Sequence, residues 1–507
     1  MIVGCYDGEP TAATPCPPPA VAASTRQAAP FSVTRLSVLM PVYNERWTLG
    51  EIVSRVFASP LNVDIELIIV DDCSTDGSWE LIQELAAADS RIKPLRHERN
   101  RGKGAAIRTA IPHITGEVAI IQDADLEYDP QEYPQLLAPI VAGKADAVFG
   151  SRFAGDTRRV LAFWHSLVNH VLTLLSNMVN DLNVTDMETG YKMIRSDILK
   201  NLRLSSNTFT FEPELTCRLA QWGARIYETP ISYTGRGFDE GKKIRPSDGI
   251  RAIAKILHCK FIDDRFTNDA GFAAMRSSAK AKKYNRWLHS LVKPFLGARV
   301  LEAGDGPGPL TNLLAGRERL VLTVHDPIRL GQLEQRFGRR GNVRIAAANV
   351  ADPAEHAQWR SERIDTVYCA DALANFERDQ AVLQEFQSAL CPGGRCVIVV
   401  PAGKALFTGV DAELGRVRRY TCDELCGKMR RAGFEIEHSQ TFNRLGAISW
   451  AISGHLFRRR RVSPRFAAWF DRLQPVVKLL DHVLPCQGLS LIVVGRKPKT
   501  ADERLAA

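Results

Sequence analysis

Two acidic residues near position 125 have the type and spacing to hold a divalent cation. Residues 120–129 read IIQDADLEYD and place Asp123 and Asp125 two positions apart, directly after a β-branched run. Side chains at i and i+2 of an extended chain point the same way, so both carboxylates can converge on one ion. Hard cations such as Mg²⁺ or Mn²⁺ take oxygen ligands and keep positions open for phosphates. A lone D-x-D pair more often marks a solvated strand end, so the surrounding elements decide its meaning.

Three further segments put polar residues where an open α/β sheet binds ligands. Strands expected over 36–40 and 65–70 run into the polar stretches 41–45 and 71–77, each followed by a helical apolar pattern. Ligands bind beyond the carboxyl ends of such strands. The segment 100–104 (NRGKG) opens a helix, and small residues with a cation at a helix N-terminus suit a diphosphate. Each segment alone reads equally well as a capped helix or a polar turn.

In this order, the segments closely resemble family 2 glycosyltransferases of the GT-A fold, especially the dolichol- and polyprenol-phosphate sugar transferase branch. The matching segments are MPVYNE (40–45), VDDCSTDGS (70–78), NRGKGAA (100–106), QDADLEYDP (122–130) and GSRF (150–153). The resemblance covers residues 34–260 and implies transfer of a sugar from a nucleotide-sugar with inversion at the anomeric carbon. It also implies that the donor contacts Pro41, Tyr43, Glu45, Asp72, Lys103 and Asp123, and that the metal is held by Asp123, Asp125 and Glu127.

The acceptor side is less determined by the sequence. Residues 186–192 and 209–214 resemble the family's acceptor segments, and Arg236, Lys242 and Lys243 lie in a Gly-rich loop suited to phosphate oxygens. A phosphate acceptor is already ionised at neutral pH and needs no general base. A sugar hydroxyl would need a carboxylate, for which the candidates are Asp186, Glu188 and Glu212. The sequence does not choose between these two acceptor classes. The basic run in the Gly-rich loop is also typical of a solvated face.

A second pattern begins near residue 284. Residues 300–308 (VLEAGDGPG) form a strand that feeds a turn with Gly304, Gly306 and Gly308, and a second strand over 320–324 ends close to Asp326. Glycines let the backbone approach a ligand, and an acid one βαβ unit later can bind ribose hydroxyls. This layout would equally serve a dinucleotide.

The rest of this half resembles class I S-adenosylmethionine-dependent methyltransferases. The resemblance rests on 364–373 (IDTVYCADAL) and on LCPGGR (390–395), and it covers 284–498. It implies that Glu302, Gly304, Gly306, Gly308 and Asp326 hold S-adenosyl-L-methionine, with Asn349 and Val350 near its adenine. The sequence departs from the family at Asp305, at Asn349 and at LANF (373–376). Active methyl transfer and a degenerate, cofactor-binding or scaffolding domain are therefore both open.

Length and composition agree with two domains. The resemblances imply an α/β protein in which an N-terminal GT-A, Rossmann-like nucleotide-sugar domain precedes a C-terminal class I, Rossmann-like methyltransferase domain. The 507 residues exceed one core, and 66 basic against 57 acidic residues leave a net charge of +9, which favours anionic partners. We expect nucleotide-sugar, polyprenyl phosphate or glycan, and an anionic membrane surface as partners, and no nucleic acid. We expect a disordered leader over 1–33, a linker over 261–283 and a tail over 499–507.

The chain is expected to be cytoplasmic. Its 11 cysteines include no C-x-x-C pair, which is typical of reduced cysteines. No stretch reaches 18 apolar residues, the length that a membrane-spanning helix needs. Residues 160–179 suit a helix at the inner face of the cytoplasmic membrane, although an ordinary buried helix explains them as well. Residues 445–457, which four arginines follow, could also meet anionic lipid, although a solvated turn is the commoner explanation. The sequence thus predicts a bifunctional transferase at the membrane periphery, with a non-catalytic binding module as the alternative of a different class.

Overall fold

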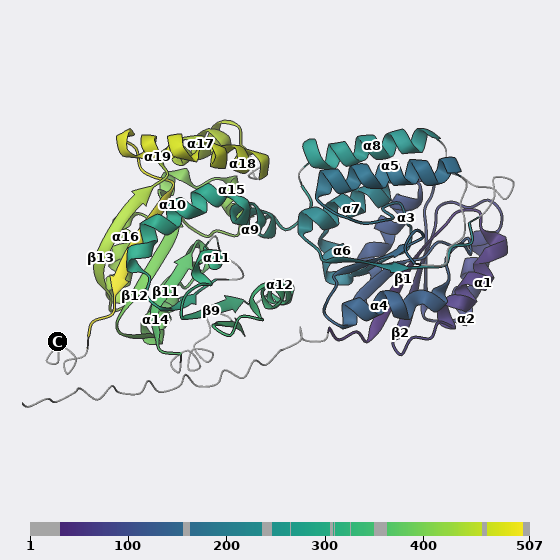
Figure 1. Cartoon of the computed structure of the whole chain (residues 1–507), viewed down its shortest axis with the longest axis horizontal. Coiled ribbons are helices and arrows are strands. Elements are labelled where there is room, and N and C mark those ends of the chain that lie inside the picture. The colour runs from purple at the N-terminus through teal and green to yellow at the C-terminus, as the bar shows by residue number, and fades with distance from the viewer. Residues whose placement is uncertain are drawn as a thin grey trace, which may run out of the picture.

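The chain folds as two α/β halves, each with a seven-stranded sheet (Figure 1). The computed structural model describes residues 31–155, 163–235, 246–263, 265–304, 308, 310–324, 326–348, 362–458 and 464–499. The predicted fold class is therefore confirmed. Nearly all of the predicted leader and tail lies outside the described residues.

The first sheet has the strand order β3-β2-β1-β4-β6-β5-β7. Strands β1 to β4 are parallel, whereas β6 runs antiparallel between β4 and β5. The parallel register brings the carboxyl ends of β1, β2 and β4 to one edge, where the polar segments follow. The strands are Arg35–Val42 (β1), Asp64–Asp71 (β2), Ile92–Arg96 (β3), Val118–Ile121 (β4), Ala147–Ser151 (β5), Lys192–Arg195 (β6) and Ile226–Pro230 (β7).

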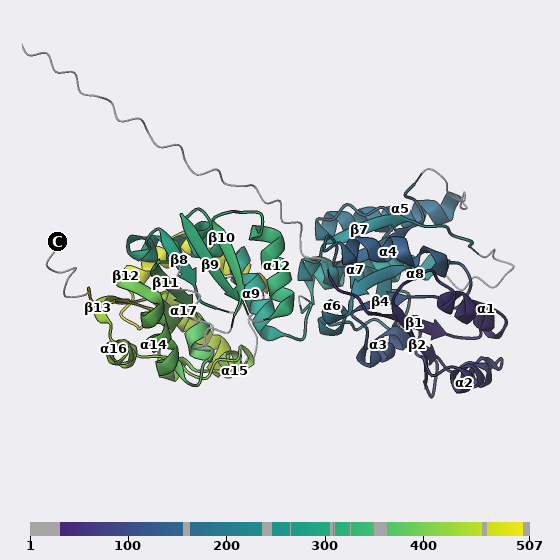
Figure 2. The ribbon, with the colours of Figure 1, turned by 90° about the horizontal axis from the view of Figure 1, so that it is seen from below.

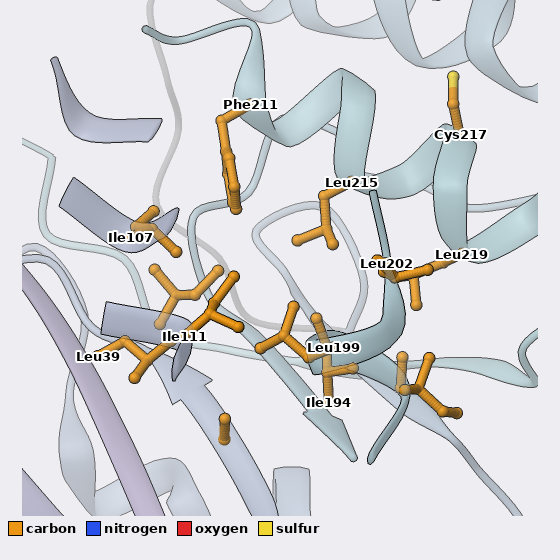
Figure 3. Close-up of a cluster of buried hydrophobic side chains, with 14 of the residues drawn as sticks. Leu39, Ile107, Ile111, Ile194, Leu199, Leu202, Phe211, Leu215, Cys217 and Leu219 are labelled. Carbon is orange, nitrogen blue, oxygen red and sulfur yellow. The ribbon is translucent and has the colours of Figure 1, made fainter. Parts of the chain in front are cut away.

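Helices cover both faces of this sheet because its central strands are buried on both sides. One face packs against α3 (Lys103–Ala110), α5 (Phe163–Asn180), α6 (Ser196–Asn201), α7 (Phe211–Trp222) and α8 (Pro246–Phe261). The other packs against α1 (Arg46–Phe57), α2 (Ser78–Ala88) and α4 (Tyr133–Val141). Figure 3 shows the first of these cores, where Ile107 of α3 and Phe211 of α7 lie near Leu39 of β1. This packing fixes the starts of α3 and α7 against the edge that carries the polar segments.

The stretch expected to be a linker is largely helical. Helix α9 (Ala270–Lys280) and the beginning of α10 (Lys282–Val292) lie within it. Phe272 of α9 packs on Trp222 of α7 with 4.2 Å between ring centroids, so α9 extends the first core. The polar run that indicated a linker contains an N-cap, because the side chain of Asp269 accepts a hydrogen bond from the Phe272 amide at 2.9 Å.

The second sheet has the order β10-β9-β8-β11-β12-β14-β13. Strands β9 and β10 follow β8 on one side, and β11 and β12 follow it on the other. The last strand, β14, lies between β12 and β13 and is antiparallel to both. The crevice beyond β8, where the strand order reverses, is the expected ligand position in such a sheet. The strands are Arg299–Glu302 (β8), Arg319–Val324 (β9), Val343–Ala347 (β10), Ile364–Ala370 (β11), Leu390–Pro401 (β12), Glu435–Phe442 (β13) and Ser490–Arg496 (β14).

The helices of the second half include a late group between β13 and β14, at the place where the sequence predicts helices. This group comprises α17 (Arg444–Ala451), the π-helical turn η8 (Ile452–Leu456), α18 (Pro464–Arg472) and α19 (Gln474–Val483). Figure 2 shows α9 and α12 at the side of this half nearest the first. The remaining helices are α11 (Thr311–Leu314), α12 (Pro327–Phe337), α14 (Asp379–Ala389), α15 (Gly409–Glu413) and α16 (Cys422–Arg431). Within the described residues, every helix is too short or too polar to cross a bilayer.

Candidate active sites

The segment after β4 presents its first carboxylate to a lysine. Gln122 anchors the segment, since the hydroxyl of Tyr133 donates to its Oε1 at 2.8 Å in a buried position. Asp123 follows, and the Nζ atom of Lys103 lies 2.9 Å from each of its two carboxylate oxygens. The structure thus joins the D-x-D segment to the predicted diphosphate seat at the start of α3.

Lys103 also contacts a third segment. Its Nζ lies 3.0 Å from Oε1 of Glu212, which begins the first turn of α7. Burial alone would lower the pKa of Lys103, but the charges of Asp123 and Glu212 raise it well above its ordinary value. The lysine is therefore a fixed cation between two carboxylates.

Glycines make this approach of segments possible. Gly102 has a φ of +94°, and a Cβ on it would lie 2.5 Å from the carbonyl oxygen of Asn207. A Cβ on Gly190 would lie 2.7 Å from Asp123 Oδ2 and 3.1 Å from Lys103 Nζ. The Gly190 amide donates to the hydroxyl of Tyr128 at 3.1 Å. The backbone at residue 190 therefore forms one wall of the site.

The other two predicted metal ligands lie in a crowded acidic turn. The Glu127 amide donates to Asp125 Oδ1 at 3.2 Å, and the Tyr233 hydroxyl donates to Glu127 Oε2 at 2.8 Å. Burial, with the charges of Asp123 and Glu127, raises the pKa of Asp125. Within the described ranges, no group of three His, Cys, Asp or Glu side chains forms a ready metal site. A cation here would need ligands from a bound molecule or water.

Two predicted acceptor-side carboxylates have unsatisfied atoms. Glu188 Oε1 and Glu212 Oε2 are buried and have no hydrogen-bond partner within the described part of the chain. Burial and the charge of Glu212 raise the pKa of Glu188. The buried Lys192 donates from Nζ to the carbonyls of Met187 (2.9 Å) and Thr189, which holds the turn that carries Glu188 and Gly190. These atoms are suited to meet polar groups of a bound ligand.

The third acceptor-side carboxylate is bound within the protein. Arg152 donates to Asp186 from Nε (2.7 Å), Nη2 (2.8 Å) and its backbone amide (3.1 Å). Asn169 of α5 also donates to Asp186, at 3.2 Å. Burial opposes ionisation, but the Arg152 charge and these hydrogen bonds lower the pKa of Asp186. Asp186 is thus a buried, ionised partner of Arg152.

The predicted donor-binding residues on β1 and β2 have different surroundings. Asp72 is 3% exposed and accepts hydrogen bonds from the amides of Arg101 (2.8 Å) and Gly102 (2.6 Å). His97 Nδ1 lies 2.7 Å from the same carboxylate. Asp72 therefore shapes the loop that leads into Lys103. Pro41 and Tyr43 lie at and just beyond the end of β1, and Glu45 precedes α1, on the same edge of the sheet.

In the second half, Glu302 ends β8 inside the protein. The Thr311 hydroxyl donates to its Oε1 at 2.9 Å, while Oε2 is buried without a hydrogen-bond partner among the described residues. Burial raises the pKa of Glu302 to about 7. Gly308 passes so close to this carboxyl that it leaves no space for a Cβ. The Glu302 carboxyl thus lies directly beside Gly308, at the end of β8 where the strand order reverses.

The structure describes only some of the other predicted cofactor-binding residues of this half. The Gly304 amide donates to the Thr323 hydroxyl at 3.0 Å, which ties the turn after β8 to β9. Asp326 follows β9 and accepts a hydrogen bond from the Arg329 amide at 3.0 Å in the first turn of α12. The predicted residues that lie outside the described part are Arg236, Lys242, Lys243, Gly306, Asn349 and Val350.

Comparison with known proteins matches each half to a family model. Residues 37–203 match the family model described as glycosyl transferase family 2, and residues 275–439 match one described as a methyltransferase domain. The polyprenol monophosphomannose synthase of Mycolicibacterium smegmatis is 32% identical over 40% of this chain and 78% of its own length. The chain belongs to glycosyl transferase family 2. The predicted fusion of a family 2 domain, with its GT-A fold, to a methyltransferase domain is confirmed.

Other relatives of this family 2 protein carry different names. The dolichol-phosphate mannosyltransferase of Pyrococcus furiosus is 26% identical over 41% of this chain, which spans 59% of that protein's length. Among solved structures, glucosyl-3-phosphoglycerate synthase from Mycobacterium tuberculosis, in complex with Mn²⁺, uridine diphosphate and phosphoglyceric acid, is 20% identical. Its TM-score is 0.36, and the match covers 45% of this chain and 79% of that one.

In the family 2 domain, the structure brings Lys103, Asp123 and Glu212 together from three separate segments. Sequence reasoning gave no role to Arg152 or Lys192. Both lie inside segments that carried the family resemblance, GSRF (150–153) and the acceptor segment 186–192. The available signal was a cation inside each matching segment, next to apolar or acidic neighbours, because a cation that becomes buried must be paired or hydrogen-bonded.

Proposed function

We propose that the family 2 domain transfers a sugar from a nucleotide-sugar to a polyprenyl phosphate or a cell-envelope glycan, with inversion. The observation that carries this proposal is the contact of Lys103 with both Asp123 and Glu212 at the N-terminus of α3. A fixed cation at a helix N-terminus suits a diphosphate, and the acids beside it suit the sugar and its acceptor. The names of the polyprenol- and dolichol-phosphate relatives agree with this substrate class.

The donor site fits a Mg²⁺ or Mn²⁺ ion. Asp123, Asp125 and Glu127 would hold it. Burial, followed by the charges of Asp123 and Glu127, raises the pKa of Asp125, and a bound cation would favour its ionised form. When bound, such an ion neutralises charge on the departing nucleotide. Lys103 adds a second positive charge beside Asp123, and Asp72 holds the loop that positions Lys103.

A phosphate acceptor suits the carboxylates better than a sugar hydroxyl. A hydroxyl acceptor needs a free, ionised base. Asp186 is bound by Arg152, Glu212 contacts Lys103, and burial favours the neutral form of Glu188. A phosphate oxygen is already ionised and makes no such demand.

Helix α5 supports a lipid-linked acceptor at the membrane surface. Its protein-facing side carries buried polar residues, including Asn169, Thr173 and Ser176, beside a few apolar ones. Several of its large apolar side chains are exposed. Trp164 is 73% exposed and Met178 is 75% exposed. An amphipathic helix of this orientation suits the headgroup region of a bilayer. Asn169 links it to Asp186 on the acceptor side, so the protein would act at the periphery of the cytoplasmic membrane.

For the second half we propose S-adenosylmethionine-dependent methylation of a related glycan or lipid-linked product. The unsatisfied Oε2 of Glu302, next to Gly308, fits a ribose hydroxyl, and Asp326 fits the same sugar. S-adenosylmethionine would supply the methyl group, and these residues would orient it. Calorimetry with S-adenosylmethionine tests this, with loss of heat expected in Asp326→Ala. Absence of binding by the unchanged protein would leave a scaffold domain as the alternative.

The test of the first proposal uses the full chain with a panel of nucleotide-sugars and either polyprenyl phosphate or a glycan. We expect product only with Mg²⁺ or Mn²⁺ present, abolition by a chelator, and a loss of about 10²-fold in Asp125→Asn, because a metal ligand is removed. Unchanged turnover in Asp125→Asn would refute the metal assignment. Transfer to a glycan alone would refute the phosphate acceptor.

A further inference from the structure

The late helices of the methyltransferase half carry a second apolar surface. Ile448, Ile452 and Leu456 are exposed at spacings of four along α17 and η8, and Val476, Leu479 and Val483 are exposed along α19. Helices α17 and α19 are in contact with one another. We call these six side chains the late apolar face. Contiguous exposed apolar side chains on two neighbouring helices mark an interaction surface.

The opposite side of α19 packs in the normal way. Val477 is fully buried in the core of this half, and Gln474 is also buried. Leu479 and Val483, by contrast, are 70% and 74% exposed. The six side chains of the late apolar face are absent from the core of this half, so they do not take part in its packing.

The charges around this face are strongly biased. The sequence over 444–485 has eight Lys and Arg residues against two Asp, and the structure describes the side chains of four of the basic residues, Arg444, Arg458, Arg472 and Lys478. Both acids are used inside the protein, since Asp471 accepts hydrogen bonds from the amides of Lys283 (3.3 Å) and Tyr284 (2.8 Å), and Asp481 accepts one from the amide of Arg444 (2.5 Å). Arg458, Arg472 and Lys478 are exposed. Such a surface is complementary to a negatively charged apolar boundary.

We propose that the late apolar face docks the methyltransferase half onto an anionic phospholipid bilayer. The combination of exposed apolar stripes with a basic rim favours a lipid surface over a protein, because each stripe can enter the headgroup region while the rim meets lipid phosphates. The inference deepens the proposed function and rests on it for the lipid-linked substrate that both halves would share.

The placement of the helices agrees with a single membrane plane. Figure 1 shows α17, α18 and α19 along the same side of the molecule as α5 and α8. Helix α9 connects the two sides, because its Phe272 packs on Trp222 of the family 2 half while α9 also contacts α18. Docking through both faces would hold each active site beside the same bilayer, and raise the local concentration of a lipid-linked intermediate for the second half.

The experiment measures flotation of the full chain with phosphatidylcholine vesicles, with and without phosphatidylglycerol. We expect binding to the anionic vesicles that weakens with added salt, and a loss of about tenfold or more in Leu479→Glu/Val483→Glu. Leu479→Ser/Val483→Ser, which adds no charge, is a second variant with an expected smaller loss in the same direction. Val141→Glu, at an exposed apolar position on α4, is the matched control and should bind normally.

A parallel assay separates this inference from the proposed function. Sugar transfer to a detergent-dispersed polyprenyl phosphate needs no bilayer, so it should be unchanged in all three variants. Failure of that assay in the unchanged protein would refute the proposed function without altering the flotation result. Unchanged flotation of both α19 double variants would overturn the docking proposal. The proposal would also be overturned if the α19 double variants had a lower mass in sedimentation but unchanged flotation, because the face would then join two copies of the chain.

Discussion

Lys103 Nζ lies 3.0 Å from Glu212 Oε1, although the two residues begin different helices on different segments of the family 2 domain. The same Nζ contacts Asp123, which follows β4. One cation therefore connects the segment predicted to bind the donor with the segment predicted to bind the acceptor. Removal of its charge should affect both sides of the reaction.

Replacing Lys103 with methionine should lower kcat/KM by about 10²-fold or more, because a preorganised charge at the diphosphate is lost. Asp123 and Glu212 would also lose their shared partner, so calorimetry should detect weaker binding of the nucleoside diphosphate. The matched control is Lys200→Met, on an exposed position of α6, which should leave both measurements unchanged. Normal nucleotide affinity in Lys103→Met would contradict the assignment of this lysine.

The Gly190→Ala substitution tests the wall of the site. Its Cβ would lie 2.7 Å from Asp123 Oδ2 and must displace Asp123 or Lys103. We expect kcat/KM to fall by about 10- to 100-fold through misplacement of reacting groups, with a small change in thermal midpoint. Gly50→Ala on α1 has nothing within 4 Å of the new Cβ, so it should keep activity and raise stability by about 1 kcal/mol. Equal activity of the two variants would show that residue 190 does not border the site.

The sequence predicts local elements well because each carries its own signal. The strands before 41 and 71 and the helix after NRGKG all form where their apolar spacing indicates. Asp123 and Lys103 were both assigned to the donor, but their direct contact, and that of Lys103 with Glu212, depend on how α3 and α7 pack on the sheet. Spacing along one chain contains no information on such distant partners. The predicted linker contains helix α9, whose start the polar residues mask in the sequence because Asp269 acts as its cap.

Glu302 predicts a pH dependence in the stability of the second half. Burial raises its pKa from 4.5 to about 7, so the folded state binds the proton more tightly than the unfolded state. Stability is therefore greatest below pH 4.5 with respect to this group, and is lost as the pH rises through about 7. The loss should be about 3 kcal/mol.

Thermal midpoints of the unchanged protein and Glu302→Gln, measured across this pH range, check that prediction. As the pH rises, the thermal midpoint of the unchanged protein should fall relative to that of Glu302→Gln, because glutamine cannot ionise. Glu318→Gln, in an exposed ion pair with Arg299, should show no such trend. Parallel pH profiles for Glu302→Gln and the unchanged protein would contradict a buried, weakly acidic Glu302.

Asp186 and Arg152 should behave as a structural pair. Asp186→Ala leaves the Arg152 guanidinium buried without its carboxylate, so it should reduce the free energy of unfolding by about 3–5 kcal/mol. The double variant Arg152→Leu/Asp186→Leu removes both charges. In urea unfolding, its loss of unfolding free energy should be smaller than the sum of the losses in Arg152→Leu and Asp186→Leu. Asp186→Asn distinguishes this role from catalysis. Its turnover per folded molecule should stay within about tenfold of normal, whereas loss of a general base would cost about 10²- to 10⁴-fold at full folding.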